Sequence, residues 1–248
     1  MKKLIAFDLD GTLALSKQPL DDEMAELLAQ LLDVAMVDII SGGDWPQFET
    51  QVVARMPAHA NLANFIISPT TGTKLYRFEN GAWTKVYADL FSAEESERIR
   101  TALKTATEQA GHANEQTWGE QIEDRGSQVT FSALGQQAPL EAKDHWDPDH
   151  AKRKAMQAIL QPMLPGLSIN IGGSTSIDIT REGIDKAYGL KRLSETVGVA
   201  LDDIMFLGDA IFPGGNDYPA KTLGLDTVRV RDVAETKSVV TGIIACLK

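Results

Sequence analysis

Residues 3–12 read Lys-Leu-Ile-Ala-Phe-Asp-Leu-Asp-Gly-Thr, and this stretch decides the fold class. Its apolar first half predicts a short buried strand, which opens into a loop that carries Asp8 and Asp10. Two carboxylates this close repel each other unless they share a cation or a proton. Solvated acids at a strand end would fit the acidic pair alone equally well, but Gly11 and Thr12 suit a tight turn with a hydroxyl facing a site. The whole motif therefore favours a hard cation such as Mg²⁺, which binds oxygen ligands and accepts phosphate.

Outward from this stretch, apolar runs and helical patterns alternate at both ends of the chain. Further strands are expected at 34–40, 65–67, 204–207 and 227–230, a hairpin at 75–87, and helices at 22–32, at 185–197 and at the C-terminus. Such alternation predicts a parallel sheet covered by helices on both faces.

The middle of the chain has a different pattern. A polar helix is expected at 92–111, and a second helix from Asp147-Pro148 toward Leu160, closed by Pro162 and Pro165. Strands are expected at 128–133, 168–171 and 176–180. This reads as an α+β segment with antiparallel strands. We therefore expect an α/β fold with a Rossmann-like parallel-sheet core from residues 1–87 and 184–248, into which residues 88–183 are inserted as an α+β cap domain.

Polar residues follow several of the predicted core strands. Asp8, Ser41 and Asp209 each come directly after an apolar run, and Asn216-Asp217 follow in the same loop as Asp209. Because sites of such sheets form beyond the carboxyl ends of the strands, these residues are expected to meet there. Taken alone, Ser41 also fits a plain turn, Lys186 fits a solvated surface, and the Gly-rich loop before Asp217 fits a turn.

These pieces, in this order, resemble the haloacid dehalogenase superfamily of phosphotransferases. The resemblance implies that Asp8 is the nucleophile, which forms an aspartyl-phosphate, and that Asp10 is the general acid/base. It also implies an Mg²⁺ ion held by Asp8, by the backbone carbonyl of Asp10 and by Asp209, with Asn216-Asp217 supporting the metal site. Lys186 would offset the negative charge of the carboxylates and of the transferring phosphoryl group.

The cap segment is similar to that of eukaryotic-type phosphomannomutase. The similarity lies in residues 125–136 and 172–178 of the cap, and it continues into residues 182–190 and the core loop 208–218. It implies that Arg125 contacts phosphate and that Ser176 and Asp178 contact sugar hydroxyls. It also implies a small phosphorylated sugar as substrate and, as an expectation, a homodimer formed through the cap.

The chain departs from that family at three positions. Lys17, Gln136 and Lys143 align with arginines of the family. Arginine grips phosphate bidentately, lysine only as a point charge, and glutamine carries no charge. A mutase must retain its bisphosphate intermediate, so we expect a phosphatase acting on a sugar phosphate, with a phosphohexomutase as the alternative. A non-catalytic sugar-phosphate sensor is a third interpretation, which the intact Asp8 and Asp10 disfavour.

Bulk composition limits the remaining classes of function. The 248 residues carry a net charge of −11, which disfavours binding to nucleic acid or anionic membrane and requires local cations at a phosphate site. There is one cysteine, so no internal disulfide forms, and no apolar run reaches a membrane-spanning length. A cytoplasmic protein is expected.

Overall fold

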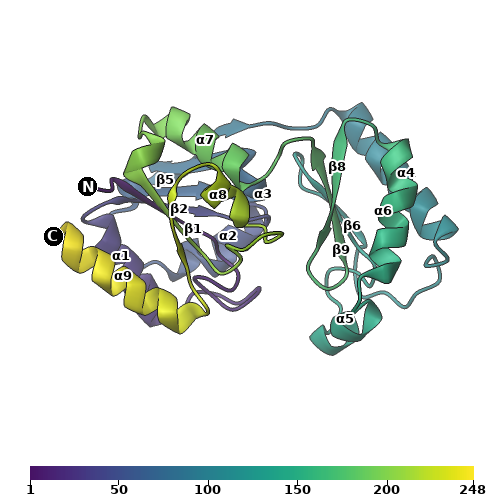
Figure 1. The fold of residues 1–248 in the computed structure, drawn as a ribbon, viewed down its shortest axis with the longest axis horizontal. Coiled ribbons are helices and arrows are strands. Elements are labelled where there is room, and N and C mark those ends of the chain that lie inside the picture. Colours follow the sequence, from purple (N-terminus) through teal and green to yellow (C-terminus); the bar gives the residue numbers. More distant parts are fainter. The chain divides into compact units, whose positions relative to one another are not determined.

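The computed structural model describes the backbone of residues 1–248 and every side chain except that of Leu140. Contacts divide the chain into two compact units, residues 1–88 with 185–248, and residues 89–184 (Figure 1).

The first unit is built on a seven-stranded sheet with the order β11-β10-β1-β2-β3-β4-β5. Its strands are β1 (Leu4–Phe7), β2 (Met36–Ile40), β3 (Phe65–Ser68), β4 (Lys74–Glu79), β5 (Ala82–Ala88), β10 (Ile204–Gly208) and β11 (Asp226–Arg229). Strands β11, β10, β1, β2 and β3 run parallel, whereas the hairpin β4–β5 continues the sheet antiparallel. The sheet is therefore mixed, and its parallel part agrees with the predicted α/β class.

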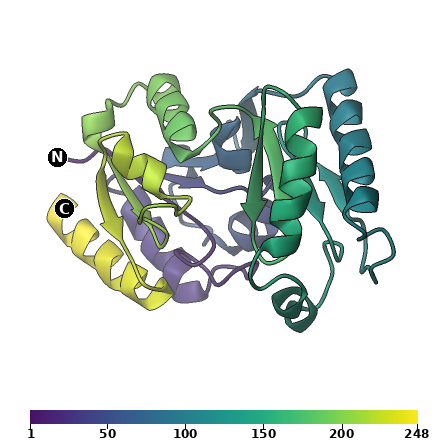
Figure 2. The same cartoon turned by 45° about the vertical axis from the view of Figure 1, so that its right-hand side comes forward.

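Helices cover both faces of this sheet (Figures 1 and 2). Helices α1 (Asp22–Leu32) and α9 (Val233–Leu247) lie side by side on one face. Ile5 and Phe7 of β1 pack into the core on that side, and Leu4 and Ala6 pack into a second core with residues of α7. Because β1 is buried on both faces, it reads as a continuous apolar run.

The other helices of this unit are short or lie near the strand ends. They are α2 (Trp45–Gln51), α3 (Pro69–Gly72), α7 (Lys186–Val197), α8 (Tyr218–Thr222) and the single turns η1 (Val53–Arg55), η2 (Leu62–Asn64) and η3 (Leu201–Asp203).

The second unit has its own four-stranded antiparallel sheet, ordered β6-β7-β9-β8. Its strands are β6 (Ile122–Asp124), β7 (Val129–Ser132), β8 (Leu167–Gly172) and β9 (Ser176–Arg181), and its helices are α4 (Ala93–Gln109), α5 (Leu140–Trp146) and α6 (Ala151–Met163). Helices α4 and α6 pack together over one face of this sheet (Figure 2). Since Ile177 and Ile179 enter the core on that face, the alternation of β9 places Ser176 and Asp178 on the opposite face.

The helix expected from Asp147-Pro148 starts later than predicted, and it ends between Pro162 and Pro165. Helix α6 begins only at Ala151, after His150 in the left-handed region, and it runs through Pro162 to Met163. Asp147 lies outside the helix and accepts hydrogen bonds from the backbone N–H of Lys152 at 2.9 Å and from Arg153. The acidic cap is therefore present, but it acts from several residues upstream. Helices α2 and α5 were not predicted.

Among the described residues, no helix is both long and apolar enough to cross a membrane.

Candidate active site

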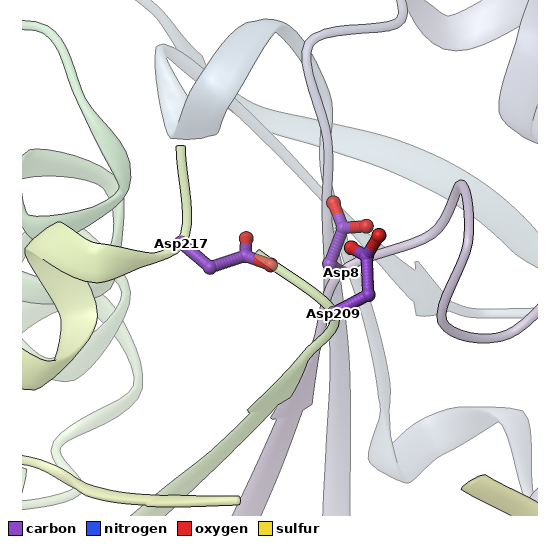
Figure 3. Close-up of side chains that lie close together, drawn as sticks. All are labelled: Asp8, Asp209 and Asp217. Atoms are coloured by element: carbon purple, nitrogen blue, oxygen red, sulfur yellow. The ribbon is translucent and has the colours of Figure 1, made fainter. Parts of the chain in front are cut away.

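Two aspartates are brought together by neighbouring strand ends. Asp8 follows β1 and Asp209 follows β10, and these parallel strands pair with Phe7 opposite Leu207. Asp217 reaches the same place from the loop before α8. One carboxylate oxygen from each of Asp8, Asp209 and Asp217 lies within 4.8 Å of the others (Figure 3). This acidic group forms at the edge where sites of parallel sheets are found.

The Gly-Thr pair after Asp10 joins the two strand ends. Gly11 has a φ of +88°, and a Cβ there would lie 2.7 Å from Asp209 Oδ2, so glycine is required by both conformation and space. The hydroxyl of Thr12 accepts the backbone N–H of Asp209 at 3.1 Å and lies 3.5 Å from Asp8 Oδ2. This turn therefore fixes the spacing between the Asp8 and Asp209 carboxylates.

Lys186 supplies the positive charge in this group. It is the first residue of α7, whose N-cap Asp185 accepts the backbone N–H of Tyr188. The Lys186 ammonium is buried, donates to Asp8 Oδ1 at 2.5 Å and also contacts Asp217 Oδ1. The second oxygen of Asp217 accepts the backbone N–H of Ala210 at 3.0 Å. The contact between Lys186 and Asp217 could not be predicted from the sequence, because it depends on how α7 packs against the loop that follows β10.

The protonation of this group reflects its burial. Burial raises the pKa of Asp8 to about 7; Lys186 opposes the shift, and the carboxylates of Asp217 and Asp209 add to it. Burial alone would lower the pKa of Lys186, but Asp8 and Asp217 outweigh it and leave that pKa raised. Burial and the Asp217 carboxylate also raise the pKa of Asp209.

The donor set fits a divalent cation. Asp8, Asp209 and Asp217 bring three carboxylates against the single ammonium of Lys186, so the group lacks positive charge. Hard cations such as Mg²⁺ and Ca²⁺ prefer oxygen ligands of this kind. The site is therefore suited to a divalent metal, and the neighbouring negative charges add to the rise in carboxylate pKa that burial causes.

Asp10 is held apart from the acidic group. Its Oδ1 accepts the backbone N–H of Lys17 at 2.8 Å, and its Oδ2 accepts Nε2 of Gln47 at 3.3 Å. Lys17 therefore binds Asp10 through its backbone N–H, and the residue as a whole is exposed. Gln47 was not among the residues singled out in the sequence, since no local pattern connects it with Asp10.

Ser41 lies at the end of β2, and Asn216 lies in the loop before Asp217. Ser41 is buried, and its carbonyl oxygen accepts the backbone N–H of Thr71 at 2.9 Å. Asn216 is exposed, unlike the buried Asp217. Lys74, which the sequence analysis also missed, is buried at the start of β4 and pairs with Asp44 at 2.6 Å. A lysine at the start of a buried strand was the available signal.

In the second unit, Arg125 and Asp178 belong to one polar cluster. Arg125 pairs with Glu123 at 2.8 Å. Asp178 Oδ1 accepts Thr130 Oγ1 at 2.7 Å and Gln128 Nε2 at 3.0 Å. Burial raises the pKa of Asp178, and the hydrogen bond from Thr130 opposes the shift. Ser176 lies on the same strand, two residues before Asp178, and shares its face.

Gln136 and Lys143 form a second contact in this unit. The ammonium of Lys143 donates to the backbone carbonyl of Gln136 at 3.1 Å. The Nε2 atom of Gln136 is buried and has no hydrogen-bond partner among the described residues. This side chain therefore presents an unused donor, but no charge.

Comparison with known sequences gives one consistent result. The family model described as Eukaryotic phosphomannomutase matches residues 24–241. The chain is similar to the phosphomannomutase of Schizosaccharomyces pombe, with 25% identity over 96% of this chain and 94% of that protein. It is also similar to that of Spinacia oleracea, with 27% identity over 86% of this chain and 83% of that protein, and to phosphomannomutase 1 of Homo sapiens, with 25% identity over 94% and 89%.

Solved structures agree in fold. A haloacid dehalogenase-like hydrolase from Bacteroides thetaiotaomicron superposes with a TM-score of 0.68 and 16% identity, covering 98% of this chain and 100% of that one. An N-terminally truncated IMP-nucleotidase of Plasmodium falciparum gives a TM-score of 0.69 and 15% identity, covering 100% of this chain and 71% of that one. At such low identity, these likenesses establish the architecture alone.

Proposed function

Because the chain belongs to the eukaryotic phosphomannomutase family, within the haloacid dehalogenase superfamily, we propose that it transfers a phosphoryl group through Asp8 and interconverts hexose 1- and 6-phosphates. The observation that carries the chemistry is the meeting of Asp8, Asp209 and Asp217 around the buried Lys186. The match of the family model over residues 24–241 supports the mutase over the phosphatase that the sequence analysis preferred.

In the first step, a carboxylate oxygen of Asp8 attacks phosphorus and the bond to the sugar oxygen breaks. Asp10 gives its proton to that leaving oxygen. In the return step, Asp10 takes the proton of the free hydroxyl of a hexose monophosphate, and this oxygen displaces Asp8 from phosphorus, so that a hexose bisphosphate forms. After the bisphosphate has turned around, Asp8 removes its other phosphate, and the hexose phosphate with the opposite regiochemistry is released. Lys186, which donates to Asp8 at 2.5 Å, offsets the negative charge on the nucleophile and phosphoryl group.

We propose that the divalent ion is Mg²⁺. It would be held by the carboxylates of Asp8 and Asp209 and the backbone carbonyl of Asp10, with support from Asp217. When bound, it would neutralise negative charge on the nucleophile and the phosphate. The exposed Asn216 belongs to this proposal only as a supporting residue of the loop.

We propose that the second unit, residues 89–184, selects the substrate. Arg125 would bind the phosphate that is not transferred, Ser176 and Asp178 would bind sugar hydroxyls, and Gln136 and Lys143 would complete the recognition. In the first unit, Ser41 and Lys17 would bind the substrate phosphates. A homodimer through this second unit stays a prediction, for which light scattering is the measurement.

Hydrolysis is the second candidate function, and the second unit supplies the observation that favours it. Arg125 is already paired with Glu123, Lys143 donates to a main-chain carbonyl, and Gln136 is uncharged. A bisphosphate held by so few free cations is more easily lost, in which case water replaces the second sugar hydroxyl as acceptor.

One incubation separates the two activities. The protein is mixed with mannose 1-phosphate, Mg²⁺ and a trace of hexose bisphosphate. Hexose 6-phosphate as the product supports the mutase, and inorganic phosphate as the main product supports the hydrolase and contradicts the mutase.

The covalent mechanism is tested with Asp8→Asn, which we expect to abolish both products. Asp202→Asn is the matched control, because this exposed acid precedes the start of β10, at the end of the strand away from Asp209. Equal turnover by Asp8→Asn and the wild type would overturn the mechanism.

A further inference from the structure

We propose that Gln47 is a positioning residue, which holds the carboxylate of Asp10 in the orientation that proton transfer requires. This inference rests on the proposed acid–base role of Asp10. Gln47 lies in the middle of α2, and its Nε2 atom donates to Asp10 Oδ2 at 3.3 Å and to Gln51 Oε1 at 2.9 Å. The two hydrogens of a single amide group are thus used on two acceptors.

The contacts fix Asp10 from both sides. Its Oδ1 atom accepts the backbone N–H of Lys17, seven residues further along the same loop, and its Oδ2 atom accepts Gln47 from a separate element. A carboxylate held at both oxygens has a defined plane, whereas one held by Lys17 alone could rotate about that single hydrogen bond. Acid–base catalysis depends on such geometry, because the proton must pass along a short and well-aligned path.

The fold reserves space for the Gln47 amide. A Cβ atom on Gly43 would lie 2.6 Å from Gln47 Cδ and still closer to Oε1. The φ of Gly43 lies outside the left-handed region, so a side chain here would be tolerated by the backbone but would displace the Gln47 amide. The backbone at Gly43 is well anchored. The Gly43 carbonyl accepts the backbone N–H of Thr70 at 2.8 Å, and the next residue, Asp44, pairs with Lys74.

The amide is suited to positioning because it does not ionise. It neither competes for the transferred proton nor adds charge beside a phosphate. The contact with Gln51 is also an i,i+4 pair within α2, so an exclusively structural role is the competing explanation. An experiment must therefore separate loss of proton transfer from a general loss of stability.

Leaving-group dependence makes that separation. The rate of Asp8 phosphorylation is measured in single turnover with mannose 1-phosphate, whose leaving sugar oxygen needs a proton, and with acetyl phosphate, whose leaving acetate does not. For Gln47→Leu we expect a loss of about tenfold or more with the sugar phosphate, as part of the typical acid–base contribution, and little loss with acetyl phosphate. An equal loss with both donors, or no loss with either, would overturn the role of Gln47.

A pair of adjacent glycines gives an independent test. Gly43→Ala should displace the Gln47 amide and reproduce the selective loss, and it should add nothing further to Gln47→Leu, because both changes break one contact. Gly42→Ala is the matched control, since a Cβ there meets no atom within 4 Å. Additive losses in the double variant would contradict the proposal even if Gln47→Leu folds poorly.

The Asp10→Asn variant tells the two levels of inference apart. If it shows the selective loss and Gln47→Leu does not, Gln47 has no positioning role and the proposed function stands. If Asp10→Asn affects both donors equally, the acid–base role of Asp10 fails, and the inference on Gln47 fails with it.

Discussion

Asp38 is a buried carboxyl on β2, and its surroundings differ from those of Asp8 although burial raises the pKa of each to about 7. Asp8 sits among charged groups, which fits a role at a metal or phosphate. Asp38 has only a hydrogen bond from Ser68 at 2.7 Å, and its Oδ2 atom has no partner among the described residues. A raised pKa by itself therefore does not mark a functional residue, and the neighbours must be considered.

Asp38 should make the stability of the protein fall as the pH rises. The folded state keeps this proton up to about pH 7, whereas the unfolded chain loses it near the ordinary value of 3.8. Between these two values the folded state binds more protons, so the free energy of unfolding declines with increasing pH, by on the order of 4 kcal/mol for this group. Urea titrations from pH 4 to pH 8 should show a smaller decline for Asp38→Asn. Parallel profiles for the two proteins would contradict this.

Lys186 should matter most in the absence of metal. Removing it as Lys186→Met leaves the buried carboxylates of Asp8 and Asp217 without their ammonium partner. We expect a loss of about 3 kcal/mol in EDTA and a larger gain in Tm on adding MgCl₂ than in the wild type. The exposed Lys191 on the same helix provides the control, Lys191→Met, which should change neither quantity. The same Mg²⁺-induced shift in Lys186→Met and the wild type would argue against a metal at the Asp8 group.

At the scale of elements, helix α7 carries Lys186 to the strand ends, and its position depends on a close approach to α3. Gly189, one turn after Lys186, lies against Gly72 and Thr71. A Cβ on Gly189 would be 2.5 Å from Ile40 Cδ1 and 2.7 Å from the carbonyl oxygen of Thr71. The contact therefore requires glycine within a helix, where alanine would otherwise be preferred.

Gly189→Ala should consequently destabilise the protein despite its better helix propensity. We expect the clash to lower the free energy of unfolding by about 1–3 kcal/mol, measured by urea titration. Gly242→Ala in α9 is the matched control, because a Cβ there meets no atom within 4 Å, and it should stabilise the protein by up to about 1 kcal/mol. Equal effects of the two substitutions would show that α7 does not depend on this approach.

At the scale of the whole molecule, the second unit has the features of an independent domain. It is one continuous segment, residues 89–184, with its own sheet and a core that includes Phe131, Leu103 and Met156. The first unit, by contrast, is formed from two separated parts of the chain.

A fragment of residues 89–184 should therefore fold alone. We expect a single cooperative unfolding transition in urea, followed by circular dichroism. A shorter fragment that ends at Leu160 lacks β8 and β9. Because β9 is the strand that pairs with both β7 and β8, we expect that this shorter fragment does not fold. A non-cooperative transition in the longer fragment would show that this unit depends on the rest of the chain.

Elements with local signals in the sequence could be predicted before the structure was known. A strand in the apolar run before Asp8, a hairpin at residues 75–87 and a helix starting at residue 92 were predicted, and the structure confirms all three. Alternating strands and helices also predicted the α/β class with an α+β insert, because each pattern follows from the burial of its own residues. At the start of α6 the local signal was wrong, because Asp147 bonds to Arg153, whose guanidinium also donates to the distant carbonyls of Gly172 and Gly173.

Proximity of Asp8, Asp209 and Lys186 was expected from the strand ends and the resemblance, but the individual contacts follow from the folded arrangement alone. Asp8 and Lys186 are 178 positions apart, and Asp10 and Gln47 are 37 apart. Their contacts depend on the strand order of the sheet and on the path of the loops at its edge, for which the chain carries no local signal. The unpartnered Gln136 amide was equally invisible, because satisfaction of a polar group is a property of its surroundings and not of its residue type.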